Sequence, residues 1–342
     1  MTFSTRLPVR PAHRTTFRTL RGAAVFIAAS GALSAASSFA AQTAPAPTPD
    51  VTVAQLTLQP LSTSTTATST TTATATSLAS GRVVPSPIYG VTIDDVSSLS
   101  AITTSLSKLS KRPTARIVFD ETVEPAYYRK PAVEISKVGY VMGEILDSFY
   151  VPTVTVPGYV DRTRKYLNAL SDVVDIWEIG NEINGEWLGN TTDVVAKMTG
   201  AYDLVKSQNK TTALTLYYNQ GCWERKSNEM FTWANANVPS RMKQGLNYVL
   251  ISYYEEDCNG LKPNWQAVFD KLAVMFPNSK IGFGEVGTSR SQKKVDYLTR
   301  YYTMKITTPR YVGGHFWWYY RQDMVPYTKA LWSTLNTAIS KE

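Results

Sequence analysis

Two glutamates follow short, mostly apolar segments in the middle and near the end of the chain. Glu182 ends the segment Trp177–Glu182, and Glu285 follows the glycine-containing segment Lys280–Gly284. In glycoside hydrolysis one carboxyl group protonates the departing oxygen, and a second attacks or stabilises the anomeric carbon. A fold that brought Glu182 and Glu285 face to face would therefore meet the basic requirement of that reaction.

The elements that must position these glutamates are short β-rich runs alternating with segments of helical spacing, a pattern typical of a parallel sheet with crossover helices. The runs predicted as strands are 88–93, 115–119, 143–149, 174–179, 213–218, 248–253, 280–284 and 313–319. Helices are expected at 98–109, 159–170, 192–207, 265–276, 293–303 and 327–339, with less regular segments after the second and fifth strands. Eight such units in about 255 residues favour a (β/α)8 TIM barrel over an open doubly wound sheet.

The active site of such a barrel lies at the C-terminal ends of its strands. Glu182 lies just after the fourth predicted strand, and Glu285 lies just after the seventh. These two strands are on opposite sides of a ring of eight. We therefore expect the two side chains to face each other across the centre of the barrel.

Asn181 and Glu182 after the fourth strand, together with the glycine-flanked Glu285 after the seventh, resemble the large clan of retaining glycoside hydrolases. In that clan, catalytic glutamates close those two strands. The resemblance extends from residue 88 to residue 342 and implies that Glu182 is the acid/base and Glu285 the nucleophile. It also implies that Asn181 binds the 2-hydroxyl of the sugar, a contact that strengthens as the oxocarbenium ion forms.

Three further residues resemble conserved positions of the clan. Arg116, in the second predicted strand, corresponds to an arginine that holds the nucleophile ionised; its alternative role is a buried structural ion pair. Tyr253 corresponds to a tyrosine that hydrogen-bonds the nucleophile, although its neighbour Tyr254 is an alternative. Trp317 corresponds to a sugar-stacking tryptophan, with Trp318 then facing outward, unless both indoles serve packing.

Aromatic residues and two cysteines fall in predicted loops at the same end of the barrel. Trp187, Trp223 and Trp265 could stack on sugar rings or pack within their own loops. Cys222 and Cys258 follow neighbouring strands in a chain expected to leave the cytoplasm. A disulfide between them and two free buried thiols are both open.

The sequence departs from the clan pattern in its histidines. Many members carry histidines on the third and sixth strands, whereas this chain has only His13 and His315. We expect His315 to lie in the core. Without a histidine pair or a histidine–cysteine cluster we expect no zinc, and no cofactor fingerprint or serine-nucleophile elbow follows a predicted strand.

The N-terminal region predicts export. Five arginines precede an apolar stretch of small residues from 22 to 40, and residues 38–40 form a cleavage site before Ala41. The alternative is an uncleaved membrane anchor, although serines interrupt the stretch. We expect a signal peptide at 1–40, a disordered linker rich in Ser, Thr, Ala and Pro at 41–80, and a catalytic domain at 81–342 that is secreted or held in the periplasm or cell envelope.

The formal net charge of +8 depends on that export segment. Without its five arginines the 35 basic residues fall to 30, against 27 acidic residues, a net charge of about +3. This balance gives no reason to expect a nucleic-acid partner, which would call for a concentrated basic stripe.

Together these features predict a monomeric, endo-acting enzyme that cleaves β-glycosidic bonds of a polysaccharide with retention and without stable membrane insertion. A transglycosylase with the same site, a non-catalytic carbohydrate-binding barrel and a structural envelope protein are the alternatives.

Overall fold

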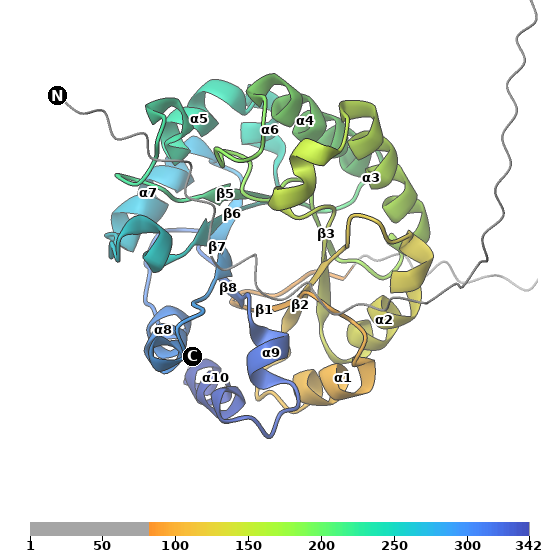
Figure 1. Cartoon of the computed structure of the whole chain (residues 1–342), viewed down its shortest axis with the longest axis vertical. Helices are drawn as coiled ribbons and strands as arrows, with labels where there is room; N and C mark the ends of the chain where they lie inside the picture. Colours follow the sequence, from red (N-terminus) through yellow and green to blue (C-terminus); the bar gives the residue numbers. More distant parts are fainter. Residues whose placement is uncertain (1–81, 342) are drawn as a thin grey trace, which may run out of the picture. The chain divides into compact units, whose positions relative to one another are not determined.

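Eight parallel strands close into a barrel in the order in which they occur in the sequence. The computed structural model describes residues 82–341 (Figure 1), so the predicted signal peptide and linker lie outside the described residues. The strands are β1 (Ile88–Ile93), β2 (Thr114–Val118), β3 (Tyr140–Glu144), β4 (Ile176–Glu178), β5 (Thr212–Tyr217), β6 (Tyr248–Tyr253), β7 (Lys280–Val286) and β8 (Gly313–Trp317). The predicted TIM barrel is confirmed.

Helices surround the strands on the outside of the barrel (Figure 1). They are α1 (Leu99–Ser107), α2 (Pro125–Val138), α3 (Val156–Leu170), α4 (Thr191–Ser207), α5 (Met230–Asn237), α6 (Ser240–Gly245), α7 (Trp265–Met275), α8 (Lys294–Tyr302), α9 (Tyr320–Met324) and α10 (Ala330–Ser340). Four 3-10 turns join them: η1 (Ser148–Thr153), η2 (Lys226–Asn228), η3 (Glu255–Cys258) and η4 (Ser291–Lys293). Within residues 82–341, every helix is too short or too polar to cross a bilayer.

The segment after β2, which looked irregular in the sequence, is the 14-residue helix α2. Pro131 removes one hydrogen bond from its interior, at a cost that usually breaks a helix. Tyr128, Ala132 and Ile135 recur at helical spacing and are all buried, so their packing against the barrel offsets that loss.

Side chains alternate along each strand between the inside of the barrel and the helix layer. Met142, Ile176 and Leu250 belong to the small apolar cluster inside the barrel. The residues two positions further along these strands point to the same side and are polar: Glu144, Glu178 and Ser252. The interior is therefore closed by apolar residues at one end and carries polar residues at the C-terminal end of the strands.

Two strands break this alternation. In β7 the pairing with β6 shifts so that Ile251 faces Phe283 and Ser252 faces Glu285, which leaves Gly284 as an extra, bulged residue. A Cβ on Gly284 would lie 2.8 Å from the Cβ of Leu250, so a side chain does not fit there.

In β8 the residues from Gly313 to Phe316 all have positive φ, and the pairing with β1 also shifts. Because of this irregularity, simple alternation does not give the direction of the side chains at the end of β8.

Candidate active site

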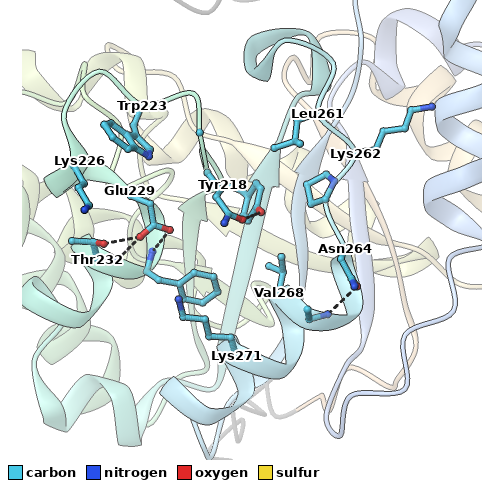
Figure 2. Close-up of a pocket in the computed structure, with 15 residues that line it drawn as sticks. Tyr218, Trp223, Lys226, Glu229, Thr232, Leu261, Lys262, Asn264, Val268 and Lys271 are labelled. Atoms are coloured by element: carbon cyan, nitrogen blue, oxygen red, sulfur yellow. Dashed lines mark hydrogen bonds between the residues drawn. The ribbon is translucent and has the colours of Figure 1, made fainter.

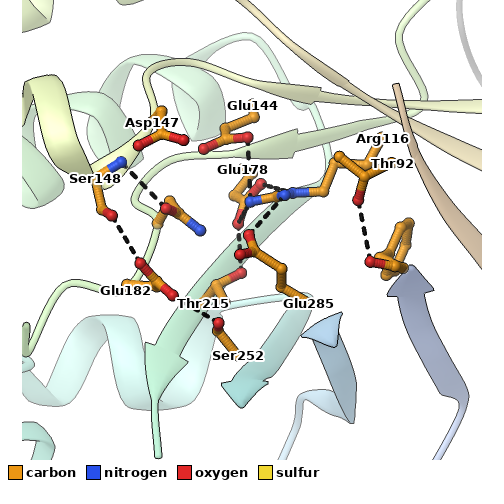
Figure 3. A network of polar contacts seen from close by, with 12 residues as sticks. Thr92, Arg116, Glu144, Asp147, Ser148, Glu178, Glu182, Thr215, Ser252 and Glu285 are labelled. Carbon is orange, nitrogen blue, oxygen red and sulfur yellow. Dashed lines mark hydrogen bonds and ion pairs between the residues drawn. The ribbon is translucent and has the colours of Figure 1, made fainter. Parts of the chain in front are cut away.

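Arg116 of β2 is the centre of a buried polar cluster at the C-terminal end of the strands (Figure 3). Its Nε donates to Oε2 of Glu178 at 2.6 Å, and its Nη1 donates to Oε2 of Glu285 at 2.9 Å. Its Nη2 donates to Oε1 of Glu178 at 3.2 Å and lies 3.1 Å from Oε2 of Glu144. One guanidinium therefore serves three carboxyl groups on three other strands.

The charges of this cluster do not balance if all three carboxyl groups are ionised, because Arg116 supplies a single positive charge. Burial would lower the pKa of Arg116, but Glu144, Glu178 and Glu285 together raise it well above its usual value. Burial raises the pKa of Glu144 well above its usual range, and the attraction of Arg116 only partly opposes this. The oxygens of Glu144 also lack a hydrogen-bond partner within residues 82–341. Of the three carboxyl groups, Glu144 is therefore the one for which burial most clearly opposes ionisation.

Glu285 stands on the bulge of β7 and is completely buried. Besides Arg116, it accepts a hydrogen bond of 2.6 Å from the hydroxyl of Tyr254 to its Oε1. Both of these contacts are with donors, so each oxygen of the carboxyl group accepts a hydrogen bond.

Glu182 lies in the loop after β4 and has a positive φ of 50°, a conformation that is strained for a non-glycine residue. Two hydroxyl groups contact its carboxyl group. Ser148 donates to Oε2 at 2.7 Å, and Ser252 donates to Oε1 at 2.6 Å. Figure 3 shows Glu182 and Glu285 in the same cluster, but only Glu285 bonds to Arg116 there.

Asn181 lies beside Glu182 and is almost fully buried. Its Oδ1 accepts a hydrogen bond of 3.1 Å from the backbone nitrogen of Ser148, which fixes the side-chain amide. The amide nitrogen Nδ2 is buried without a hydrogen-bond partner among the described residues. A buried donor without a partner is costly, so this nitrogen is suited to donate to a bound hydroxyl group.

The choice of Tyr253 over Tyr254 was wrong. Tyr248, Leu250 and Ser252 face the inside of β6, so Tyr253 points into the helix layer, where its hydroxyl donates to the carbonyl of Leu261 at 2.6 Å. Tyr254 is the residue that contacts Glu285.

The side chains at the end of β8 point in other directions than expected. Trp317 is completely buried, and its Nε1 donates to Oδ2 of Asp323 at 2.9 Å, within the helix layer. Trp318 is only partly buried, and the Arg116 guanidinium lies 5.8 Å from the centre of its ring. The run of positive φ values in β8 shifts the alternation by one residue. His315 lies in the core as predicted, and burial lowers its pKa to about 3.

The three loop tryptophans have different surroundings. The indole nitrogen of Trp187 donates to Oγ of Ser148 at 3.1 Å, which links it to the acidic cluster. Trp223 lines a separate hollow of about 820 Å³ between the loops after β5 and β6 (Figure 2). Trp265 does not lie on the rim; it is buried and packs its ring against Tyr218, 5.1 Å away.

Cys222 and Cys258 are joined by a disulfide, with their Cα atoms 5.1 Å apart. It connects the loops that follow β5 and β6. The bridge therefore lies at the base of the two loops that line the hollow with Trp223.

Several residues of the cluster were not predicted from the sequence. Glu178 lies on the inner face of β4, two residues before Gly180. Strand alternation alone could have identified it. Glu144 was hidden because the third strand was predicted from 143 to 149, so that it fell near the beginning of the strand instead of its end. Ser148 and Ser252 carry no sequence signal of their own.

No protein-family model and no curated protein matches the sequence. Solved structures do match. Gas2p of Saccharomyces cerevisiae in complex with laminaritriose and laminaritetraose aligns with a TM-score of 0.50 and 13% identity, over 74% of this chain and 64% of that chain. The apo form of a Gas2p mutant aligns with a TM-score of 0.50 and 11% identity, over 74% and 60%.

The chain thus spans less than two thirds of the length of these two neighbours. At identities this low the similarity concerns the fold. The described part of the chain is a parallel eight-stranded barrel of the kind found in Gas2p, with a cluster of buried carboxyl groups at the C-terminal ends of its strands.

Proposed function

We propose that this chain is a retaining glycoside hydrolase, with Glu285 as nucleophile and Glu182 as acid/base. The observation that carries the proposal is the different environment of the two carboxyl groups. Glu285 bonds to the Arg116 guanidinium and the Tyr254 hydroxyl, whereas Glu182 accepts hydrogen bonds from the hydroxyl groups of Ser148 and Ser252. Paired carboxyl groups with separated environments are the usual basis for separate nucleophile and acid roles.

In this mechanism the ionised Glu285 attacks the anomeric carbon while the neutral Glu182 gives its proton to the departing glycosidic oxygen. The product of this step is a glycosyl ester on Glu285, and Glu182 becomes ionised. Glu182 then takes a proton from a water molecule, the water oxygen attacks the anomeric carbon, and the carboxylate of Glu285 departs. Two inversions give net retention.

The neighbouring residues support these steps. Arg116 and Tyr254 hold the carboxylate of Glu285 in place for attack and bind it again when it departs. The free amide nitrogen of Asn181 is proposed to bind the 2-hydroxyl of the sugar. Trp318, and not Trp317, is proposed as the stacking surface, because it lies over Arg116 at the open end of the barrel.

For the substrate, β-1,3-linked glucose oligosaccharides are the first choice, because Gas2p, with the same fold, is found in complex with laminaritriose and laminaritetraose. We further propose endo action on a polysaccharide and export by the segment 1–40, on the basis of the rim tryptophans and the N-terminal sequence. Trp187 and Trp223 would then contact sugar units outside the catalytic subsite.

The test is turnover of laminari-oligosaccharides and polysaccharide by the wild-type protein, Glu182→Gln and Glu285→Gln, with Glu134→Gln on the exposed face of α2 as the matched control. We expect each catalytic variant to lose at least about 1000-fold in kcat, because each residue takes part in bond making or breaking. The control should keep full activity. Full activity in either catalytic variant refutes the role assigned to the replaced glutamate.

Product analysis with and without added acceptor separates hydrolysis from glycosyl transfer. Binding of the oligosaccharides by the wild-type protein without turnover would favour a carbohydrate-binding barrel instead.

A further inference from the structure

Glu182 is held by a chain of hydrogen bonds that has a direction. The indole nitrogen of Trp187 donates to Oγ of Ser148 at 3.1 Å, and Ser148 donates to Oε2 of Glu182 at 2.7 Å. An indole N–H group can only donate, whereas a hydroxyl group both accepts and donates. Accepting from Trp187 therefore orients Ser148 so that its own proton points to Glu182.

Ser148 is well fixed in this position. It is completely buried, and its backbone nitrogen donates to Oδ1 of Asn181 at 3.1 Å. It begins η1, directly after Asp147, whose carboxylate accepts from the backbone of Phe149. The hydroxyl group thus approaches Glu182 from a rigid turn and not from a mobile loop.

The second oxygen of Glu182 has a different partner. Oε1 lies 2.6 Å from Oγ of Ser252 on β6. When Glu182 is ionised, Ser252 can donate to Oε1; when Oε1 carries a proton, Ser252 can rotate and accept it. The two oxygens are therefore not equivalent.

We propose that Trp187 and Ser148 form a one-way hydrogen-bond relay that keeps Oε2 of Glu182 as an acceptor, so that the transferable proton resides on Oε1 beside Ser252. Ser148, Ser252 and Trp187 are in this view positioning residues, which act through Glu182. The catalytic role of the relay rests on the proposed function. The relay itself is a property of the protein without substrate.

The relay has a measurable consequence. A hydrogen bond to an ionised carboxylate is stronger than one to a neutral carboxyl group, so Ser148 stabilises ionised Glu182 more than protonated Glu182. Removal of the hydroxyl should raise the pKa of Glu182 by about one unit. Removal of the Trp187 donor weakens the same bond and should raise that pKa by about half a unit, again from the strength of one hydrogen bond.

Other charged and titratable groups lie at this end of the barrel. Those in the cluster of Figure 3 are Arg116 of β2, Glu144 of β3, Asp147 after β3, Glu178 of β4 and Glu285 of β7, and Tyr254 after β6 bonds to Glu285. None of them is replaced in the variants below, so a difference between variants reports the relay.

The experiment is a pH titration of the full chain labelled with 13C at the glutamate carboxyl carbons, followed by NMR. The signal that disappears in Glu182→Gln is that of Glu182, and turnover is not needed. The variants are Ser148→Ala, Ser148→Thr, Ser252→Ala, Trp187→Phe and the double variant Trp187→Phe with Ser148→Ala. Trp223→Phe, a loop tryptophan outside the relay, is the matched control.

We expect upward shifts of about one unit in Ser148→Ala, with a return toward the wild-type value in Ser148→Thr, which keeps the hydroxyl. Ser252→Ala should also shift upward, and the control should not shift. Because Trp187 acts through Ser148, the double variant should equal Ser148→Ala.

An unchanged or lowered pKa in Ser148→Ala, or a Trp187→Phe shift that adds in full to that of Ser148→Ala, overturns the relay. If Ser148→Ala does not fold, Trp187→Phe decides, and an unchanged or lowered pKa of Glu182 in that variant overturns the relay. The proposed function is tested separately: it is refuted if Glu182→Gln remains active. The titration does not depend on that outcome.

Discussion

Glu144 gives the sharpest prediction about the electrostatics of the barrel. It shares Arg116 with Glu178 and Glu285, and all four side chains are at most 1% exposed. Burial raises the pKa of Glu144 in the folded state, more than Arg116 lowers it. The folded protein therefore binds a proton at Glu144 that the unfolded chain releases above its ordinary pKa of about 4.3.

The sign of the effect follows from this difference. A group with a raised pKa in the folded state contributes stability that is fully present below its pKa in the unfolded chain. That contribution is lost as the pH rises toward its pKa in the folded state. The loss is about 1.4 kcal/mol for each pH unit within that window, or roughly 3 kcal/mol over two units.

Glu144→Gln removes this titration while it preserves the shape of the side chain. The oxygens of Glu144 make no hydrogen bond within the described residues, and the amide oxygen of glutamine can keep the 3.1 Å contact with Arg116. We expect the free energy of unfolding of the variant, minus that of the wild type, to rise with pH from about pH 5, with a slope of up to about 1.4 kcal/mol per unit.

The assay is urea unfolding at pH 5, 6, 7 and 8, followed by tryptophan fluorescence. Glu134→Gln is the control, because it makes the same chemical change on the exposed surface of α2, where Glu134 pairs with Lys137. The difference in free energy of unfolding between Glu134→Gln and the wild type should vary little with pH. A difference for Glu144→Gln that is flat or falls with pH would mean that Glu144 is ionised in the fold, and would refute its assignment as the protonated member of the cluster.

Three other predictions concern contacts at the ends of β5, β6 and β8. Tyr254→Phe removes a hydrogen bond to ionised Glu285 and should lower kcat/KM about 10- to 100-fold, whereas Tyr253→Phe should affect only stability; equal losses in both would contradict the assignment. Trp318→Ala should raise KM for oligosaccharides with little change in melting temperature. Trp317→Phe loses a hydrogen bond to Asp323 and should lower the melting temperature with little change in KM. Replacing Cys222 and Cys258 by serine opens a link between positions 36 residues apart and should cost on the order of 3 to 4 kcal/mol in urea unfolding; no change would show that the bridge does not constrain the unfolded chain.

The barrel was predictable because each strand and helix repeats a simple pattern. β1 and β6 begin and end where the sequence indicates, since turn residues bound both apolar runs. β3 was placed too late because the segment from 145 to 149, which is mostly apolar and ends in Phe149, resembles a strand. In the structure Asp147 caps a 3-10 turn there, and Pro152 lies within that turn. The capping hydrogen bond thus favours a turn at residues whose β propensity favours a strand.

The site was predictable only where strand alternation is regular. Glu182 follows β4 as the sequence indicates, Glu285 lies near the end of β7, which runs two residues further than predicted, and Arg116 meets Glu285. The side-chain directions of Trp317 and Trp318 were not predictable, because four successive residues of β8 have positive φ, and two of them, His315 and Phe316, are residues that rarely adopt it. The serines around Glu182 come from distant segments, and only the closed barrel brings them together.

The most direct test of the central claim is to trap the covalent intermediate. The protein is incubated with an activated 2-deoxy-2-fluoro derivative of a laminari-oligosaccharide, digested and mapped by mass spectrometry. Retention through Glu285 predicts a mass increase of one glycosyl group on the peptide that contains Glu285, and no such increase in Glu285→Gln. Turnover of the natural oligosaccharide without any adduct, or an adduct on a different residue, would contradict a double displacement through Glu285.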